Sequence, residues 1–240
     1  MESNKFSSKS FTEANQIYLS SLGQDYGNFV LGKNTSRILN EDPKLLLFTL
    51  SRYKFVTKML KGSSSILEVG CQEGFGANLI IGETSEYVGI DFYKPYIEYA
   101  NQNINHSNAK FIAHDLLDAP VSRQGNESRF ESAFALDVLE HILPESEDLF
   151  LINLLSSLDS RKGKLIVGMP TLESQAYASK ASKLGHVNCK KSEDLRALIA
   201  KYFEFTFVFS MNDEVLHTGF HPMSHYVCVI GAGPTDTIRS

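Results

Sequence analysis

From residue 65 onward, short runs rich in β-branched and aromatic residues alternate with longer segments in which apolar residues recur every three or four positions. This alternation is typical of parallel strands joined by crossover helices. It predicts an α/β fold built on one doubly wound, seven-stranded sheet that is mostly parallel. The seven predicted strands are Ser65–Gly70, Tyr87–Asp91, Lys110–Ala113, Ser132–Asp137, Lys164–Gly168, Phe205–Ser210 and Tyr226–Ile230.

Four segments have the periodicity of helices that cover such a sheet: Pro43–Leu60, Tyr93–Asn103, Pro144–Leu158 and Lys191–Tyr202. In the last of them, Ser192 precedes two acidic residues. A hydroxyl and negative charge are favoured at a helix start, where backbone N–H groups are free and the helix dipole is positive. Ser192 is therefore predicted to cap that helix.

The last strand is predicted to be antiparallel to the others. Only about fifteen residues separate Phe205–Ser210 from Tyr226–Ile230. Parallel pairing needs a crossover of about a dozen residues or more, usually a helix. Gly219 and Pro222 disfavour a helix in this interval. The chain is therefore expected to turn back on itself here.

Length and composition predict one folded domain. A chain of 240 residues can bury one full α/β core, whereas two domains would each be undersized. Its 42% hydrophobic and 21% charged residues are typical of a globular protein. A single domain is therefore predicted over residues 1–240, in which residues 1–60 form an N-terminal helical segment.

Charge and hydropathy limit the partners. The 23 Lys and Arg residues are outnumbered by 28 Asp and Glu, which gives a net charge of −5 and disfavours nucleic acid as a partner. No run reaches the roughly 18 apolar residues of a spanning helix, and residues 1–12 lack the apolar core of a signal peptide. These features predict a cytoplasmic protein that has no membrane partner.

Cys71, Cys189 and Cys228 lack metal-site or disulfide spacing, which favours buried thiols.

A glycine-rich turn follows the first predicted strand. Residues 66–76 read ILEVGCQEGFG, an apolar strand that leads into Gly70, Gly74 and Gly76. Glycines let the backbone approach a ligand closely, and a helix start beyond them supplies N–H donors. The dinucleotide pattern GxGxxG would require glycine in place of Gln72, which weakens a dinucleotide interpretation. A packing loop is the alternative.

The second predicted strand, Tyr87–Asp91, ends in a carboxylate about twenty residues after the glycine turn. A carboxylate at this position can accept hydrogen bonds from both hydroxyl groups of a ribose. Asp91 is therefore the strongest single candidate for binding a nucleoside. The alternative is that Asp91 only caps the following helix.

The third and fourth strands also end in acidic residues. Residues 111–117 read FIAHDLL and contain Asp115, and residues 134–142 read FALDVLEHI and contain Asp137 and His141. An imidazole titrates near neutrality and can take a proton from a hydroxyl or an amine, so His141 is the predicted catalytic base. The alternative is a structural imidazole bonded to the backbone. His114 is interpreted as a surface residue.

These four strand-end motifs occur in order over about 75 residues and resemble those of the class I S-adenosylmethionine-dependent methyltransferases of small molecules. The first motif is similar to E/D-x-G-x-G-x-G, from which Gln72 departs, and the string D-V-L-E-H-I is the most specific signal. The resemblance covers residues 65–172. It implies a Rossmann-like fold and S-adenosylmethionine as the cofactor.

The resemblance also implies roles for particular residues. Glu68 supports the loop or the methionine end of the cofactor, Phe92 flanks the adenosine, and Asp115 accepts from the adenine amine beside the Leu116 N–H. Asp137 and His141 lie where the sulfonium meets the acceptor. The predicted cofactor-binding residues are Glu68, Gly70, Cys71, Gln72, Gly74, Asp91, Phe92, Asp115, Leu116 and Asp137.

The acceptor pocket is expected to come from residues 169–225 and from the N-terminal segment, because ligands gather at the carboxyl ends of parallel strands. The segments concerned are Tyr18–Lys33, Met169–Asn188 and Asn212–His225. His186, His217 and His221 are the predicted acceptor-binding residues. His217 and His221 lie four apart after two acids, a spacing that would bind a metal or a phosphate on a helix. Gly219 and Pro222 disfavour that helix, so the sequence does not decide whether these histidines bind a metal or an anion. A solvated hairpin without a ligand is the alternative.

Three functions remain at this point. The leading one is methyl transfer from S-adenosylmethionine to an O or N atom of a small polar metabolite, such as a sugar or a phosphorylated intermediate. The second is a nucleotide-dependent oxidoreductase, which the glycine spacing disfavours. The third is a catalytically silent cofactor-binding protein.

Overall fold

The computed structural model describes residues 13–21, 30–123 and 129–236. Residues 31–240 belong to one compact unit, and residues 1–30 form another, whose helix α1 (Glu13–Ser21) is described by itself. The helices α2 (Lys33–Glu41) and α3 (Pro43–Met59) begin the compact unit. The N-terminal segment is thus helical where it is described. That residues 1–30 share one domain with the rest stays a prediction.

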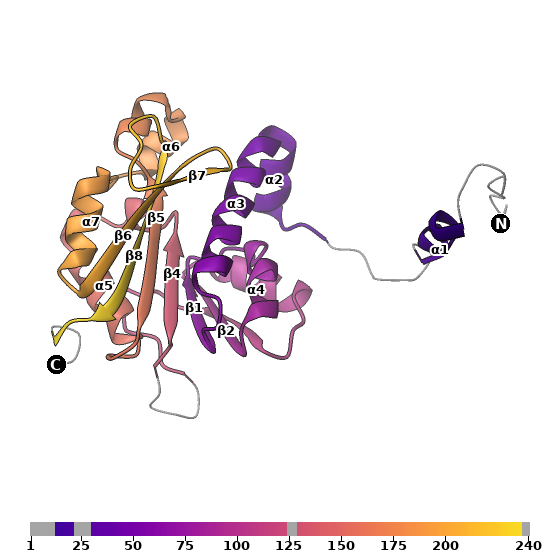
Figure 1. Ribbon diagram of the computed structural model, residues 1–240, viewed down its shortest axis with the longest axis horizontal. Helices are drawn as coiled ribbons and strands as arrows, with labels where there is room; N and C mark the ends of the chain where they lie inside the picture. The colour runs from indigo at the N-terminus through magenta and orange to yellow at the C-terminus, as the bar shows by residue number, and fades with distance from the viewer. Residues whose placement is uncertain (1–12, 22–29, 124–128, 237–240) are drawn as a thin grey trace. The chain divides into compact units, whose positions relative to one another are not determined.

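The compact unit is built around one sheet in the order β3-β2-β1-β4-β5-β8-β6-β7 (Figure 1). Strands β1 to β5 are parallel to one another. Strand β8 lies between β5 and β6 and is antiparallel to both, which confirms the expectation for the last strand. The strands are β1 (Ser65–Val69), β2 (Glu86–Asp91), β3 (Ala109–Ala113), β4 (Ser132–Leu136), β5 (Lys164–Pro170), β6 (Phe203–Asn212), β7 (Val215–Thr218) and β8 (Tyr226–Pro234).

The eighth strand corrects the predicted count of seven. Strands β6 and β7 form a hairpin in which Asn212 pairs with Val215, so that Asp213 and Glu214 make the turn. Asp213 has a φ of 51°, a left-handed conformation that Asp tolerates and tight hairpins require. Strand β7 is short, lies at the sheet edge and is largely exposed, so its side chains lack the apolar alternation by which a strand is recognised.

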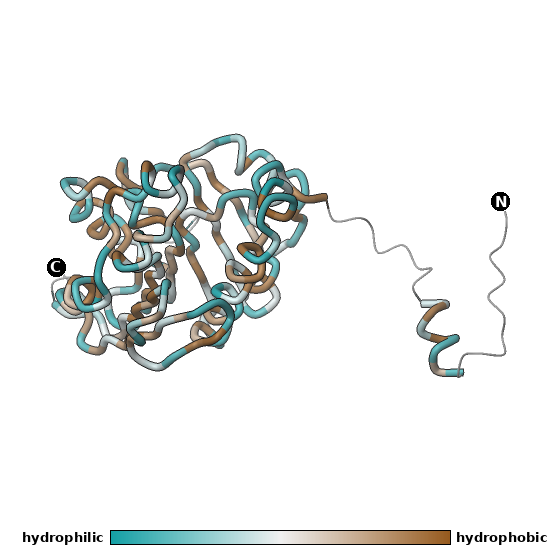
Figure 2. The backbone as a smooth tube through the Cα atoms, turned by 90° about the horizontal axis from the view of Figure 1, so that it is seen from above, coloured by the Kyte–Doolittle hydropathy of each residue, from teal (hydrophilic) through white to brown (hydrophobic). Residues whose placement is uncertain are grey.

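Helices cover both faces of the sheet. Helices α3 and α4 (Lys94–Asn103) pack on one face, and α5 (Glu147–Ser156) and α7 (Ser192–Ala200) pack on the other. Each face of the sheet has its own hydrophobic core. Along β5, Leu165 and Val167 lie in the core under α5 and α7, whereas Ile166 lies in the core under α3 and α4, as the two-residue period of a strand requires. Figure 2 shows hydrophobic stretches in the interior, while the helices carry both hydrophobic and hydrophilic residues.

Two local predictions need correction. Helix α7 begins at Ser192 itself, so Lys191 is its N-cap, and Ser192 is a buried residue of the first turn and not the predicted cap. The acidic residues Glu193 and Asp194 do lie in that first turn. After the glycine turn, the chain forms two short 3₁₀ helices, Gly76–Leu79 and Ile81–Glu83, where the start of an α-helix was expected.

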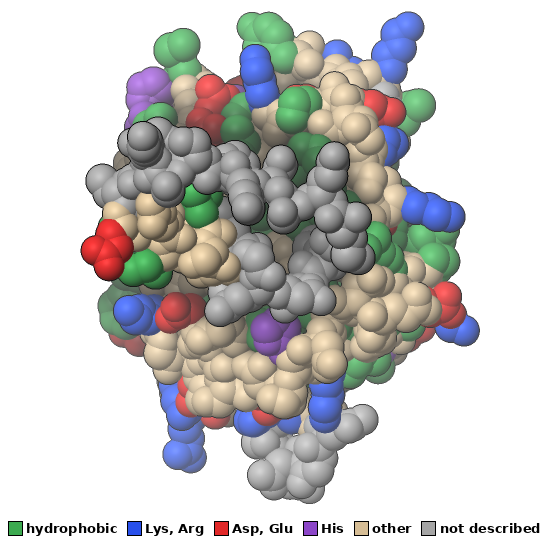
Figure 3. Space-filling model, turned by 90° about the vertical axis from the view of Figure 1, so that its right-hand side faces the viewer, with side chains coloured by type: hydrophobic (Ala, Val, Ile, Leu, Met, Phe, Trp, Pro, Cys, Tyr) green, Lys and Arg blue, Asp and Glu red, His purple; other side chains and the backbone are tan. Residues whose placement is uncertain are grey.

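Charged side chains of both signs lie on the face shown in Figure 3. On that face, Lys and Arg side chains lie among Asp and Glu side chains. Within the described ranges, every helix is too short or too polar to cross a bilayer.

The carboxyl ends of β1 to β4 meet at one edge of the sheet, and this edge carries the site.

Candidate active site

A cavity of about 570 Å³ opens at the carboxyl ends of β1, β2 and β4 and beside the loop after β3. Its size lies within the roughly 300–1,000 Å³ that is typical of small-molecule sites. The structure brings together residues from all four sequence motifs in its lining. The predicted site residues that line it are Gly70, Gln72, Asp91, Phe92, Asp115, Leu116, Asp137 and His141.

The glycine turn is held tightly against the neighbouring strand ends. Gly70 has a φ of 78°, and a Cβ added to it would lie 2.4 Å from Cγ2 of Val138. The N–H groups of Gly70 and Cys71 both donate to the carbonyl of Ile90. Only glycine fits this conformation and this contact. The turn therefore places bare backbone at the wall of the cavity.

Gln72 stands where the motif has glycine, and its backbone is in the left-handed region with a φ of 48°. Its side-chain oxygen accepts from Nδ2 of Asn34 at 2.9 Å, and its N–H donates to Oδ2 of Asp91 at 3.0 Å. These two hydrogen bonds hold Gln72 in that conformation. The bond to Asp91 couples the glycine turn to the end of β2.

Asp91 is buried at the cavity wall, and both carboxylate oxygens are oriented by backbone donors. Oδ1 accepts from the N–H of Tyr93 at 2.8 Å, and Oδ2 accepts from Gln72. Burial raises the pKa of Asp91, although these two hydrogen bonds oppose that effect. Each carboxylate oxygen has a second lone pair, so the group can still accept from a diol. The helix cap that was the alternative is Tyr93, so Asp91 orients the turn before α4 and keeps a lone pair on each oxygen for a ligand.

Asp137 is fixed by a partner that the sequence analysis missed. Nη1 of Arg52 lies 2.7 Å from its Oδ2, and the buried guanidinium stacks 3.7 Å above the ring of Tyr226. The backbone of Asp137 has a φ of 56°, and its N–H donates to the carbonyl of Gly168. The available signal was a single arginine within the apolar pattern of residues 43–60.

The loop after β3 forms a further wall. Oδ1 of Asp115 accepts from the N–H of Leu117 at 2.9 Å, and Asn153 on α5 anchors the carbonyl of Leu116 at 2.7 Å. His114, interpreted above as a surface residue, lines the cavity while its Nε2 contacts the carbonyl of Ala119 at 2.7 Å. Phe92 is 76% exposed, so its ring stands open to a ligand at the rim.

Three of the predicted cofactor-binding residues do not line the cavity. Glu68, Cys71 and Gly74 lie behind the turn, on the face covered by α3 and α4. A Cβ on Gly74 would approach Ile104 to 2.6 Å, so this glycine permits close packing. The Glu68 carboxylate accepts hydrogen bonds from the hydroxyl groups of Tyr53 and Tyr87. These residues support the turn from behind.

Glu68 should make the stability of the protein depend on pH. Burial raises its pKa from 4.5 to about 7, against the lowering effect of the two tyrosines. Below pH 4.5 the Glu68 carboxyl is protonated in both the folded and the unfolded protein. Between pH 4.5 and 7 it ionises in the unfolded protein but stays protonated in the folded one. The free energy of unfolding therefore falls as pH rises, by on the order of 3 kcal/mol.

Replacing Glu68 with Gln removes the ionisable group and keeps the shape. The amide can accept from one tyrosine hydroxyl and donate to the other. Denaturant unfolding from pH 4.5 to 8 should therefore show the variant gaining stability relative to the wild type as pH rises. A constant difference over that range would contradict a raised pKa at Glu68.

On the other side of the cavity, two histidines lie together. The ring centroids of His141 and His186 are 5.1 Å apart. Nδ1 of His141 contacts the carbonyl of Gly185 at 2.9 Å, and Nδ1 of His186 contacts Oε1 of Gln175 at 2.9 Å. Burial lowers the pKa of His186, and His141 adds to that effect. His141 therefore does bond to the backbone, as the structural alternative expected. That bond uses Nδ1 and leaves Nε2 for contact with a ligand.

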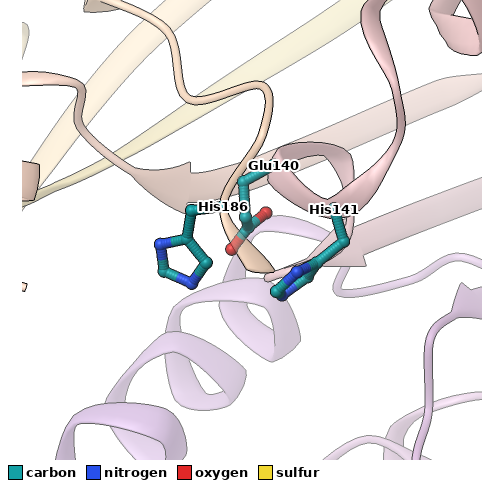
Figure 4. A group of neighbouring side chains, drawn as sticks. All are labelled: Glu140, His141 and His186. Carbon is teal, nitrogen blue, oxygen red and sulfur yellow. The ribbon is translucent and has the colours of Figure 1, made fainter. Parts of the chain in front are cut away.

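Glu140 completes this group and was not singled out from the sequence. Its side chain is fully buried, and Figure 4 shows the carboxylate between the two imidazole rings. One ligand atom from each of Glu140, His141 and His186 lies within 4.8 Å of the others. Among the described residues, this group has the geometry that could hold a metal ion.

His217 and His221 lie elsewhere. Their rings stack on each other at 4.9 Å, and neither residue lines the cavity at the strand ends. His217 is in β7, and the segment up to His221 is not helical, as Gly219 and Pro222 suggested. Their role in acceptor binding stays a prediction. Of the proposed acceptor segment Tyr18–Lys33, residues 22–29 lie outside the described residues.

Comparisons with known proteins agree with this geometry. The family model of a methyltransferase domain matches residues 60–206, more than half of the chain. A search of curated protein sequences finds no match. Among solved structures, the chain is similar to the N-methyltransferase NodS from Bradyrhizobium japonicum WM9 in complex with S-adenosyl-L-homocysteine. The TM-score is 0.59 at 16% identity, over 92% of this chain and 98% of that one.

Two further structures share the fold. The methyltransferase domain of bacterial CtHen1 gives a TM-score of 0.62 at 14% identity, over 78% of this chain and all of that one. The plantazolicin methyltransferase BpumL, in complex with a pentazolic desmethylPZN analog and SAH, gives 0.59 at 17% identity, over 84% and 90% of the two chains. At these identities the similarity shows the fold.

Proposed function

The chain belongs to the methyltransferase domain family that matches residues 60–206, and we propose that it transfers a methyl group from S-adenosylmethionine to an O or N atom of a small polar acceptor. The observation that carries the proposal is the single cavity lined by residues from all four strand-end motifs. The similar structures of NodS and BpumL are complexes with S-adenosylhomocysteine, which supports the choice of cofactor.

The lining fits the chemical groups of this cofactor. Asp91 offers free lone pairs to the ribose hydroxyl groups, and Phe92 offers an exposed ring to the adenosine. Asp115 can accept from the adenine amine beside the backbone of Leu116. The bare backbone at Gly70 and Gln72 allows close approach next to Asp137. When bound, the cofactor supplies an electrophilic methyl group on a positively charged sulfur.

The acceptor is expected on the side of Asp137 and His141. Arg52 holds Asp137 in place, and the contact with Gly185 holds the ring of His141. With its Nδ1 occupied, His141 presents Nε2 as the group that receives the acceptor's proton. Alignment of the two reactants by these fixed side chains contributes the rest of the rate. His186 does not line the cavity itself, but its ring centroid lies 5.1 Å from that of His141, and we assign it to the polar surroundings of a sugar-like or phosphorylated acceptor.

The test has two parts. Calorimetry with S-adenosylmethionine and with NAD(H) should show binding of the first and none of the second, which separates methyl transfer from the oxidoreductase alternative. Polar metabolites with hydroxyl or amine groups should then be screened for formation of S-adenosylhomocysteine. Cofactor binding without turnover on any acceptor would favour the catalytically silent alternative.

A further inference from the structure

We propose that Glu140, His141 and His186 bind one divalent transition-metal ion at the acceptor side of the cavity. His141 lines the cavity, so an ion held by this group would face the acceptor. Two imidazoles and one carboxylate are a ligand set that suits Zn²⁺, Mn²⁺, Fe²⁺ or Co²⁺ better than Mg²⁺ or Ca²⁺, which prefer oxygen ligands alone. The ligand atoms lie within 4.8 Å of one another, and an ion bound at about 2.0–2.2 Å from each would draw them together.

The Glu140 carboxylate provides an independent reason for a cation. Its side chain is fully buried, and neither oxygen has a hydrogen-bond partner within the described part of the chain. An unpaired carboxylate in such a place is costly, and buried charges are normally paired or bound to metals. The nearby cation Arg52 is already engaged by Asp137 and Tyr226. An ion between Glu140 and the two histidines would supply the missing partner.

The two imidazoles are oriented as metal ligands usually are. A metal-bound histidine commonly donates its other ring N–H to a carbonyl or carboxylate, which fixes its tautomer. His141 contacts the carbonyl of Gly185, which can only accept, so Nδ1 carries the proton. Likewise, Oε1 of Gln175 faces Nδ1 of His186, while Nε2 of Gln175 donates to the carbonyl of Thr171. Each ring therefore keeps an unprotonated Nε2 as a ligand.

The backbone around the site is fixed from both sides. The N–H groups of Val187 and Asn188 both donate to the carbonyl of Glu140, at 2.8 and 3.0 Å. Nζ of Lys190 pairs with Glu147 at 2.7 Å, and Nδ2 of Asn188 donates to the same carboxylate oxygen. The segment that carries His186 is thereby attached to the segment that carries Glu140 and His141. Three ligands from two distant parts of the sequence are held together before any ion binds.

This inference rests on the proposed function and refines the role of His141. Three protein ligands leave a coordination position open, where a hydroxyl of the acceptor can bind and lose its proton more easily. That proton passes to solvent, the oxygen lone pair forms the new C–O bond, and the electron pair of the C–S bond stays on sulfur. Nε2 of His141 then serves as a ligand and not as the base.

Metal binding can be measured without cofactor or acceptor. The purified full chain, freed of metal by chelation, is titrated with Co²⁺ and followed by its visible absorption, and with Zn²⁺ and Mn²⁺ by calorimetry. One ion should bind per chain. Glu140→Gln and His186→Ala should each weaken binding by at least the roughly 10- to 100-fold that loss of an outer-shell partner causes. The double variant His217→Ala, His221→Ala is the matched control, because it removes the other histidine pair, and it should bind like the wild type.

The outcomes separate this inference from the proposed function. No stoichiometric binding by the wild type, or binding that is lost in the control and kept in Glu140→Gln, would overturn the metal site. Glu140→Gln keeps the side-chain shape, and S-adenosylmethionine affinity reports whether the variants are folded. Cofactor binding without metal binding leaves the proposed function standing. Metal binding without cofactor binding supports this site and contradicts the proposed function.

Discussion

Asp91→Ala is expected to weaken binding of S-adenosylmethionine by roughly ten- to a hundredfold. The carboxylate lies at the cavity wall with one lone pair on each oxygen left for a ligand. Hydrogen bonds to a charged acceptor contribute about 1.5–3 kcal/mol, which corresponds to that change in affinity. The loss includes an indirect part, because Asp91 also orients the N–H groups of Gln72 and Tyr93.

Calorimetry of the variant and the wild type measures this change directly. Asp118→Ala is the control, since it removes the same charge from an exposed residue that does not line the cavity. It should leave the affinity unchanged. An Asp91→Ala variant with wild-type affinity would show that this carboxylate only shapes the turn and that the ribose binds elsewhere.

The positions of the parallel strands along the chain and the residues at their ends could be predicted from the sequence because both depend on local patterns. Each buried strand is a short apolar run, and its carboxyl end is marked by a polar residue such as Asp91, Asp115 or Asp137. A parallel sheet brings these ends to one edge. Their common edge therefore follows from the parallel direction of the strands, whereas the order of the strands in the sheet comes from the structure.

The support of the site could not be predicted in the same way, because it depends on contacts between distant segments. Arg52 meets Asp137 across 85 positions, and His186 meets His141 through a loop fixed by the carbonyl of Glu140. Glu68 fits the family motif, yet alternation along β1 turns its side chain toward Tyr53 and Tyr87, away from the cavity. A motif thus identifies the strand end, while the strand period decides which side chains face the ligand.

The same reasoning explains why Glu140 was overlooked beside His141. The string D-V-L-E-H-I directs attention to Asp137 and His141, which line the cavity, whereas a buried acid is recognised only when its surroundings are known. In the structure its carboxylate lies between two imidazoles and lacks a hydrogen-bond partner among the described residues. A buried polar group of this kind requires an explanation, because burial without a partner is costly, and the proposed metal ion is one that supplies a partner.

His141→Ala is expected to lower turnover by about 10²–10⁴-fold and to leave cofactor affinity nearly unchanged. Loss of a group that assists proton transfer has an effect of this size. The cofactor contacts proposed for Asp91, Asp115 and Gly70 do not involve His141, so binding should persist. Steady-state kinetics on the identified acceptor, together with calorimetry of the cofactor, measures the two effects separately.

His106→Ala is the control for this variant, because His106 is exposed and lies outside the cavity lining. Wild-type turnover in His141→Ala would contradict any chemical role for the imidazole and leave alignment to carry catalysis. If turnover falls, metal dependence shows how His141 acts. A wild type that loses activity on chelation and regains it with the added ion uses His141 as a ligand. A wild type indifferent to chelation uses it as the base, since one Nε2 cannot hold a metal and receive a proton at the same time.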